Sequence, residues 1–252
     1  MQPDDWDQHW ADYAASAELN PAQGYRRQLI SHFLSGNSSK RPGRIMDLGS
    51  GQGDLLAELS RMNTWAGMLG VEVSVIGVQI AARKVPTASF LQQDLLQPVP
   101  AECPYLGWAD YAVCSEVLEH LDDPGLFLRN STALMSPGCT LIVTVPGDPM
   151  SAFERHIGHR KHYSIAELCN LLGRSGFSVK SAVAAGFSFF NLYKAAVILS
   201  GDIFIQDISG NPRGIARLVS SALMWLFRGL FAFNRTQGSR GWQIAAVAEW
   251  TG

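Results

Sequence analysis

The chain has 252 residues, of which 47% are hydrophobic and 17% charged, and its formal net charge is −2. A chain of this length and apolar content can bury a sizeable core, so we expect one domain over residues 1–252 and no global disorder. The balanced charge provides no broad basic field, so nucleic acid is not an expected partner.

The cysteines and the first residues favour a cytoplasmic location. The four cysteines form no CxxC pair and have no zinc-finger spacing, which suits a reducing compartment. The opening MQPDDWDQHW lacks the basic and apolar regions of a signal peptide. The nearest approach to a spanning helix, Leu218 to Phe233, is interrupted by Arg228, so a membrane span is not predicted.

Residues 1–43 are predicted to form a helical N-terminal extension that breaks at Asn20-Pro21 and ends in a loop over 35–43. Strands then alternate with helices, which indicates βαβ units and a parallel sheet. The predicted strands are 44–48, 73–78, 88–92, 110–114 and 140–145, and helices are predicted at 54–62 and 126–135.

The pattern changes after Pro146. Ser164 and Glu167 form a capping-box pattern, which predicts a helix over 164–175. Two more strands are predicted at 177–184 and 243–250, with a helical insertion over 187–241 between them. We therefore expect a core made of residues 44–186 and 242–252.

The run IMDLGSGQGDLLAEL, residues 45–59, passes from an apolar strand through a glycine loop into an amphipathic helix. Glycines in such a loop allow positive φ and a close approach of ligand to backbone. The carboxyl end of a first strand is where open α/β sheets bind ligands. The spacing is GxGxG, which differs both from the dinucleotide pattern GxGxxG and from a P-loop.

This run resembles motif I of class I S-adenosylmethionine-dependent methyltransferases, and the resemblance extends over residues 44–184. It implies an α/β, Rossmann-like sheet of seven strands, mostly parallel with the last strand antiparallel. It also implies S-adenosylmethionine as the cofactor. The residues expected to bind it are Asp47, Gly49, Ser50, Gly51, Gly53, Gln79, Asp94, Leu95 and Ser115.

Three of these positions come from comparison with the family's second and third strands. SFLQQDLL supplies Asp94 and Leu95 after the third strand, beside the adenine. VSVIGVQIAAR places Gln79 where the family has the acidic residue that holds the ribose hydroxyls. Gln79 would be a weaker, uncharged acceptor, and Pro86 shortens the helix expected to follow.

Glu116, Glu119 and His120 stand at i, i+3 and i+4 after the fourth strand, so one helical turn would place them on one face. This pattern resembles the metal-binding turn of small-RNA 2′-O-methyltransferases and ubiquinone-pathway O-methyltransferases, with His159 or His162 completing the ligand set. In many class I methyltransferases the same turn implies no metal, and His120 would then cap the turn or line the pocket. We expect no metal here, and keep these residues as the candidate ligands.

The segment FERHIGHRKHYS, residues 153–164, resembles the GHxxxFT-type segment of small-molecule methyltransferases related to the ubiquinone O-methyltransferases. A neutral histidine there can take the proton of an attacking hydroxyl, so His120, His159 and His162 are the candidate catalytic residues. The basic residues of the segment could instead bind an acidic group of the acceptor, or could form a solvated loop.

The insertion over 187–241 is rich in large apolar residues, which suits a lid over the acceptor, a dimer surface, peripheral membrane contact, or packing within the core. The expected function is S-adenosylmethionine-dependent methyl transfer to oxygen of a small or lipid-linked acceptor. The alternatives are an inactive cofactor-binding scaffold and, less favoured, a nicotinamide-dependent oxidoreductase.

Overall fold

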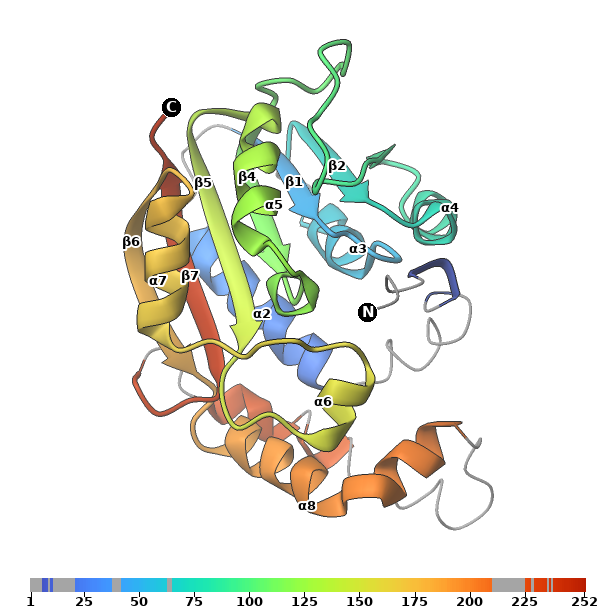
Figure 1. The fold of residues 1–252 in the computed structure, drawn as a ribbon, viewed down its shortest axis with the longest axis vertical. Coiled ribbons are helices and arrows are strands. Elements are labelled where there is room, and N and C mark those ends of the chain that lie inside the picture. The colour runs from blue at the N-terminus through green and yellow to red at the C-terminus, as the bar shows by residue number, and fades with distance from the viewer. Residues whose placement is uncertain are drawn as a thin grey trace.

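The computed structural model describes residues 6–8, 10, 21–37, 42–62, 65–209, 225–227, 229–234, 236 and 238–252. Its centre is a seven-stranded sheet with the strand order β3-β2-β1-β4-β5-β7-β6 (Figure 1). Strands β1 to β5 run parallel to one another, and β7 runs antiparallel to both β5 and β6. This confirms the expected mostly parallel sheet with an antiparallel last strand.

The strands are β1 Arg44–Leu48, β2 Gly67–Glu72, β3 Ser89–Gln92, β4 Ala109–Ser115, β5 Met135–Pro146, β6 Phe177–Ala185 and β7 Gln243–Trp250. The helices are α2 Pro21–Asn37, α3 Asp54–Ser60, α4 Val75–Lys84, α5 Pro124–Ser131, α6 Ala152–His156, α7 Ile165–Arg174 and α8 Phe189–Ser209. Short 3₁₀ turns occupy η1 Leu118–His120, η2 Thr132–Leu134 and η3 Phe231–Phe233.

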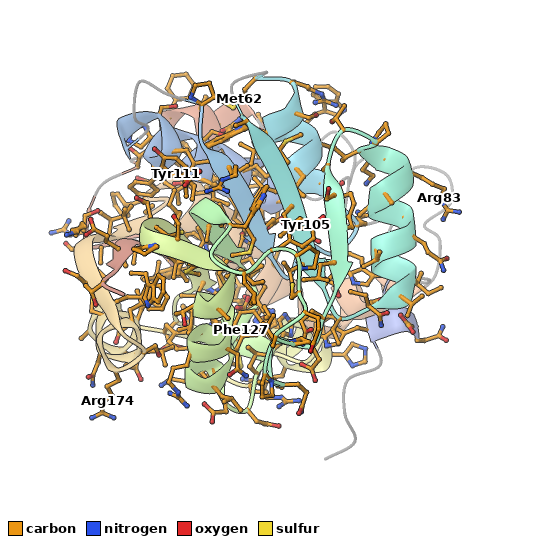
Figure 2. The ribbon with its side chains drawn as sticks, turned by 90° about the horizontal axis from the view of Figure 1, so that it is seen from above. Met62, Arg83, Tyr105, Tyr111, Phe127 and Arg174 are labelled. Atoms are coloured by element: carbon orange, nitrogen blue, oxygen red, sulfur yellow. The ribbon has the colours of Figure 1, made fainter. Side chains whose placement is uncertain are left out.

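The sheet is covered by helices on both faces because its strands alternate their buried side chains between two clusters. Ala112 and Cys114 of β4 belong to the cluster that α5 and α7 cover. Tyr111 and Val113 of the same strand belong to the cluster that α2 and α3 cover. Figure 2 shows side chains filling the space on both sides of the strands.

The prediction for the second strand was wrong. The strand is β2, Gly67–Glu72, and the residues predicted as a strand lie mostly in α4. The hydroxyl of Ser74 accepts a hydrogen bond from the backbone N–H of Gly77 and so caps α4. Pro86 therefore follows α4 rather than shortening a later helix.

Other boundaries agree more closely with the predictions. α7 begins after Ser164 with the predicted capping box, and it buries Leu168 and Leu172. α2 begins at the predicted break and ends at Asn37, within the stretch predicted as a loop. β5 begins at Met135, before the predicted start at residue 140, with a register shift against β4.

The described part of the insertion is helical, as predicted. Phe190 of α8 packs with Phe227 and Phe231 against Ala22 and Tyr25 of α2. This part of the insertion is therefore packed against the core. Among the described residues, no helix combines the length and the apolar character needed to cross a membrane.

Candidate functional site

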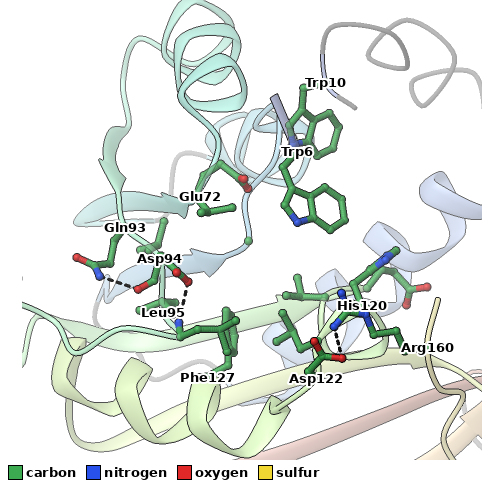
Figure 3. Close-up of a pocket in the computed structure, with 17 residues that line it drawn as sticks. Trp6, Trp10, Glu72, Gln93, Asp94, Leu95, His120, Asp122, Phe127 and Arg160 are labelled. Carbon is green, nitrogen blue, oxygen red and sulfur yellow. Dashed lines mark hydrogen bonds and ion pairs between the residues drawn. The ribbon is translucent and has the colours of Figure 1, made fainter. Parts of the chain in front are cut away.

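A cavity of about 330 Å³ lies beyond the carboxyl ends of β1 to β4 (Figure 3). Parallel strands present their carboxyl ends at one edge, which is where open α/β sheets bind ligands. The lining residues are Trp6, Trp10, Gly49, Val71, Glu72, Val73, Gln93, Asp94, Leu95, Leu96, Glu116, Val117, His120, Leu121, Asp122, Phe127 and Arg160.

The glycine loop after β1 forms part of the wall of this cavity. Gly49 lines it, and its N–H donates to the carbonyl of Val71 over 2.8 Å. Gly51 has a φ of 51°, and a Cβ there would collide with the ring of Trp10. Gly53 has a φ of 79°, and a Cβ there would press on Ala81 of α4. Gly53 thus serves helix packing, while Gly51 allows the ring of Trp10 to lie against the loop backbone.

Glu72, at the end of β2, is hydrogen-bonded to this loop. Its carboxylate accepts the N–H of Gly51 at 2.8 Å and the N–H of Ser74 at 3.0 Å. Burial raises the pKa of Glu72, and these hydrogen bonds oppose that rise. Glu72 therefore couples the glycine loop to the end of β2.

Gln79 does not reach this position. It lies on α4, exposed to solvent, because the second strand ends six residues earlier than predicted. The assignment of the ribose contact to Gln79 therefore rested on a wrong strand. The sequence did carry a signal for Glu72, since it ends an apolar run and lies 21 residues after Gly51, near the spacing of ribose-binding acids in related sheets.

Two further acidic residues lie near the ends of strands, Asp47 in β1 and Asp94 after β3. Asp47 of β1 is 4% exposed, and burial, together with the charges of Glu72 and Asp54, raises its pKa to about 7. Asp94 lines the cavity, and its carboxylate accepts the N–H of Leu96 at 2.8 Å. Leu95 also lines the cavity. Ser50 and Ser115 are not among its lining residues.

The N-terminal extension contributes two lining residues that the sequence reasoning missed. Trp10 lies against Gly51 and Gly77, at the glycine loop. Trp6 packs edge-on to the ring of His120, with 5.1 Å between centroids. No motif marks these tryptophans, because the first strand begins more than thirty residues later.

Glu116 separates from the other two candidate metal ligands. Its φ of 56° is left-handed, and the helical turn η1 begins only at Leu118, so the expected i, i+3 spacing does not apply. Its carboxylate instead forms an ion pair with Arg26 at 2.8 Å and accepts the amide of Gln243 at 2.8 Å. Glu116 therefore joins α2 and β7 to the cavity wall.

Glu119, His120 and His159 do come together. One ligand atom from each lies within 4.8 Å of the others, and Glu154, His159 and His162 form a second such group. Neither carboxylate oxygen of Glu119 has a hydrogen-bond partner among the described residues, although Glu119 is fully buried. Burial, then the charge of Glu116, raises its pKa well above the ordinary value. A buried carboxylate between two imidazoles fits a divalent cation.

The three candidate catalytic histidines lie at different depths. His120 lines the cavity, and His159 packs edge-on behind it with ring centroids 4.7 Å apart. Burial, followed by the charges of His120 and His162, lowers the pKa of His159 to about 2. His162 is 5% exposed and lies behind His159, 3.1 Å from it. Of these histidines, only His120 lines the cavity.

The cations of the histidine segment are engaged by neighbouring groups. Arg160 pairs with Asp122 and lines the cavity. Lys161 pairs with Glu167 at 2.9 Å and lies over the ring of Tyr163. The backbone N–H of Arg160 donates to the carbonyl of Glu119 at 2.8 Å, which ties the segment to η1.

The comparisons with known proteins agree with this arrangement. A sequence model described as a methyltransferase domain matches residues 22–182, which is more than half of the chain. The chain belongs to this methyltransferase family. This confirms the class I, S-adenosylmethionine-dependent methyltransferase expected from the sequence. The two departures from the family pattern, Gln79 and the shortened helix before Pro86, both came from the wrong second strand.

The curated relatives share the name ubiquinone biosynthesis O-methyltransferase. The ubiquinone biosynthesis O-methyltransferase of Azorhizobium caulinodans is 32% identical over 141 residues, covering 54% of each chain. That of Xanthomonas campestris pv. campestris is 30% identical over 171 residues, covering 66% of this chain and 65% of that protein. The methyltransferase thus spans about half to two thirds of the length of these relatives.

Solved structures share the fold. The cyclase SpnF superimposes with a TM-score of 0.60 at 18% identity, covering 88% of this chain and 80% of that one. A methyltransferase from Mesorhizobium loti gives 0.53 at 16% identity, covering 88% and 97%. Phosphoethanolamine N-methyltransferase 2 of Haemonchus contortus, in complex with S-adenosyl-L-methionine, gives 0.55 at 12% identity, covering 88% and 52%.

Proposed function

We propose that this protein transfers a methyl group from S-adenosylmethionine to an oxygen atom of a small or lipid-linked acceptor. The observation that carries the proposal is the cavity at the carboxyl ends of β1 to β4, with Glu72 and Asp94 on one side and His120 on another (Figure 3). The family match and the named relatives support both the cofactor and methylation at oxygen.

The cofactor half of the site would be the glycine loop with the ends of β2 and β3. Glu72 would hold the ribose hydroxyls, in place of Gln79. Asp94 and Leu95 would face the adenine. Asp47, Ser50, Gly51 and Gly53 would shape the loop, and Ser115 would support the neighbouring end of β4 through its 2.8 Å hydrogen bond with Thr144.

The acceptor half would be the region around η1. When bound, S-adenosylmethionine supplies a methyl group already activated by its sulfonium leaving group, so the protein must align the acceptor and remove its hydroxyl proton. His120 reaches the cavity and would take that proton, with His159 directly behind it. Trp6, Leu121 and Phe127 line the same cavity and would exclude water.

A divalent cation could act in the same place, because Glu119, His120 and His159 offer a carboxylate and two imidazoles. Bound there, a cation would lower the pKa of the acceptor hydroxyl. Glu119→Gln keeps the size of the side chain and removes its charge. If a cation is used, turnover should be lost both in this variant and in the parent protein treated with a chelator. Full turnover in both experiments would exclude the cation.

Calorimetry with S-adenosylmethionine, its demethylated product and NAD tests the cofactor. We expect the first two to bind and NAD not to bind. Glu72→Gln should weaken binding by about tenfold, since hydrogen bonds to a charged acceptor contribute roughly 1.5–3 kcal/mol and those to a neutral one about 1 kcal/mol. Gln79→Ala is the matched control on exposed α4 and should bind like the parent. Equal affinity of the parent and Glu72→Gln would refute the ribose assignment.

The acceptor itself is tested by a screen with radiolabelled methyl donor, in which hydroxylated aromatic and prenylated compounds should be labelled on oxygen. Label found only on amines would contradict O-methylation.

Peripheral membrane contact is proposed from exposed apolar side chains of the insertion, including Leu192, Leu199 and Trp225. Liposome flotation should weaken in Leu199→Ser, while Leu106→Ser, exposed elsewhere, should float like the parent.

A cytoplasmic location is proposed from the cysteines. All four are free in the structure, and Cys114 and Cys139 are buried. Such thiols persist in a reducing compartment. Fractionation of cells that produce the protein would test this, and recovery from an oxidising compartment would contradict it.

A further inference from the structure

A chain of polar contacts runs from the insertion to the histidines of the site. It begins at Lys194 of α8, which is 6% exposed. Its ammonium donates to the carbonyl of Gly147 at 2.7 Å and pairs with Glu154 of α6 at 3.2 Å. Glu154 also accepts the backbone N–H of Ser151 at 2.7 Å. These contacts fix the segment that leads from β5 to the histidines.

The carbonyl of Gly147 determines which nitrogen of His162 carries a proton. Nδ1 of His162 lies 3.1 Å from this oxygen, and a carbonyl can only accept. Nδ1 must therefore carry the hydrogen. The ammonium of Lys194 donates to the same carbonyl oxygen, and this neighbouring positive charge disfavours a second one on His162, so the ring is neutral. In a neutral ring with Nδ1–H, Nε2 is an acceptor.

The same reasoning extends to His159. Its Nδ1 lies 3.1 Å from Nε2 of His162. Glu154 lies farther from that nitrogen, at 3.8 Å, and is already engaged by Lys194. Because Nε2 of His162 accepts, Nδ1 of His159 must donate. Nε2 of His159 is then left with a lone pair, on a ring that packs against His120.

We infer that His162 is a positioning residue that accepts the Nδ1–H of His159 and so leaves Nε2 as the lone-pair nitrogen of the His159 ring, which lies with Glu119 and His120. Lys194 acts one step further out, because it shares the Gly147 carbonyl that orients His162. His159 in this form can accept a proton or bind a cation through Nε2, and cannot donate there. That role in catalysis rests on the proposed function, whereas the tautomer does not.

Long-range proton–nitrogen correlation spectra of the imidazole rings test the tautomer without cofactor or acceptor. The protein has six histidines, and single substitutions assign their signals. We expect His159 and His162 both to show a protonated Nδ1 and an unprotonated Nε2, the form that free imidazole side chains disfavour. A protonated Nε2 on either ring of the parent protein would overturn the inference.

Two variants of His162 separate positioning from packing. His162→Leu removes the acceptor, so His159 should shift to the Nε2–H tautomer; His162→Gln keeps an acceptor oxygen and should restore the parent pattern. His156→Gln, exposed on α6, is the control and should change neither signal. An unchanged His159 in His162→Leu would refute the proposal. If that variant does not fold, the parent spectrum and His162→Gln still decide.

The catalytic consequence has its own readout. His162→Leu should lower kcat by at least about tenfold, as loss of a residue that orients a reacting imidazole does, with affinity for S-adenosylmethionine unchanged. His162→Gln should recover most of that loss. A parent-like kcat in His162→Leu, despite an altered tautomer, would show that His159 is not used in the reaction. Absence of any cofactor binding would instead refute the proposed function and leave the tautomer intact.

Discussion

Asp47→Asn should make the protein more stable in alkaline solution. Asp47 is a buried carboxyl in the middle of the sheet, and its pKa is raised to about 7 by burial and by the charges of Glu72 and Asp54. In the unfolded chain it titrates near 3.8. Asparagine has nearly the same shape and no charge, so the substitution removes the titration and keeps the packing.

The sign follows from proton binding. Between about pH 4 and pH 7 the folded protein holds the proton of Asp47 and the unfolded chain does not, so stability falls as pH rises through that range. A pKa raised from 3.8 to about 7 corresponds to up to about 4 kcal/mol lost above pH 7. Asp47→Asn should therefore match the parent near pH 4 and exceed it by several kcal/mol at pH 8.

Urea unfolding at a series of pH values measures this difference, and the Tm at pH 8 should rise by roughly 10 °C. Asp110→Asn is the control of opposite sign. Burial raises the pKa of Asp110, but hydrogen bonds and charge from Arg44 outweigh burial and lower it. The stability that ionised Asp110 contributes is therefore lost only in acid, below about pH 4. Parallel pH profiles for Asp47→Asn and the parent would refute the reasoning.

Three other predictions follow from single contacts. Trp10→Leu should remove most of the change in tryptophan fluorescence on cofactor binding, because Trp10 lies on the glycine loop; Trp108→Phe should not. Tyr163→Phe should cost about 1–2 kcal/mol of unfolding free energy, since its buried hydroxyl donates to a carbonyl of η1. Arg26→Met should cost about 3–5 kcal/mol of unfolding free energy, because it leaves Glu116 without its ion pair. Adding Glu116→Gln should recover most of that loss, which a double-mutant cycle measures.

The sheet was predictable where local patterns agreed with one another. β1 runs directly into the glycine loop, and α7 has its capping box, so both were assigned from a few residues. The second strand was misassigned because 73–78 is as apolar as 67–72. Ser74 as helix cap and Glu72 as strand end would have separated the two. Periodicity alone does not distinguish a short buried strand from a helix segment.

The acceptor half could be predicted only in part, because its geometry is tertiary. Sequence spacing placed Glu116 with Glu119 and His120, but the left-handed backbone at Glu116 sends its side chain to Arg26. The histidine segment was found by its composition. Its order of depth, from His120 through His159 to His162, depends on the carbonyl of Gly147 and on Lys194, which lies 47 residues further along the chain.

The difference between the two proposed halves of the site bears on which acceptor and which reaction the protein selects. The cofactor half is built from strand ends and one loop, which the fold itself provides. The proposed acceptor half consists of Trp6, η1 and the histidine segment, which lie outside the parallel strands. SpnF, named as a cyclase, shares the fold with a TM-score of 0.60, so the sheet alone does not determine the chemistry. We therefore propose that specificity resides in the segments around Glu119, His120 and His159, and substitutions there should change turnover while leaving cofactor affinity intact.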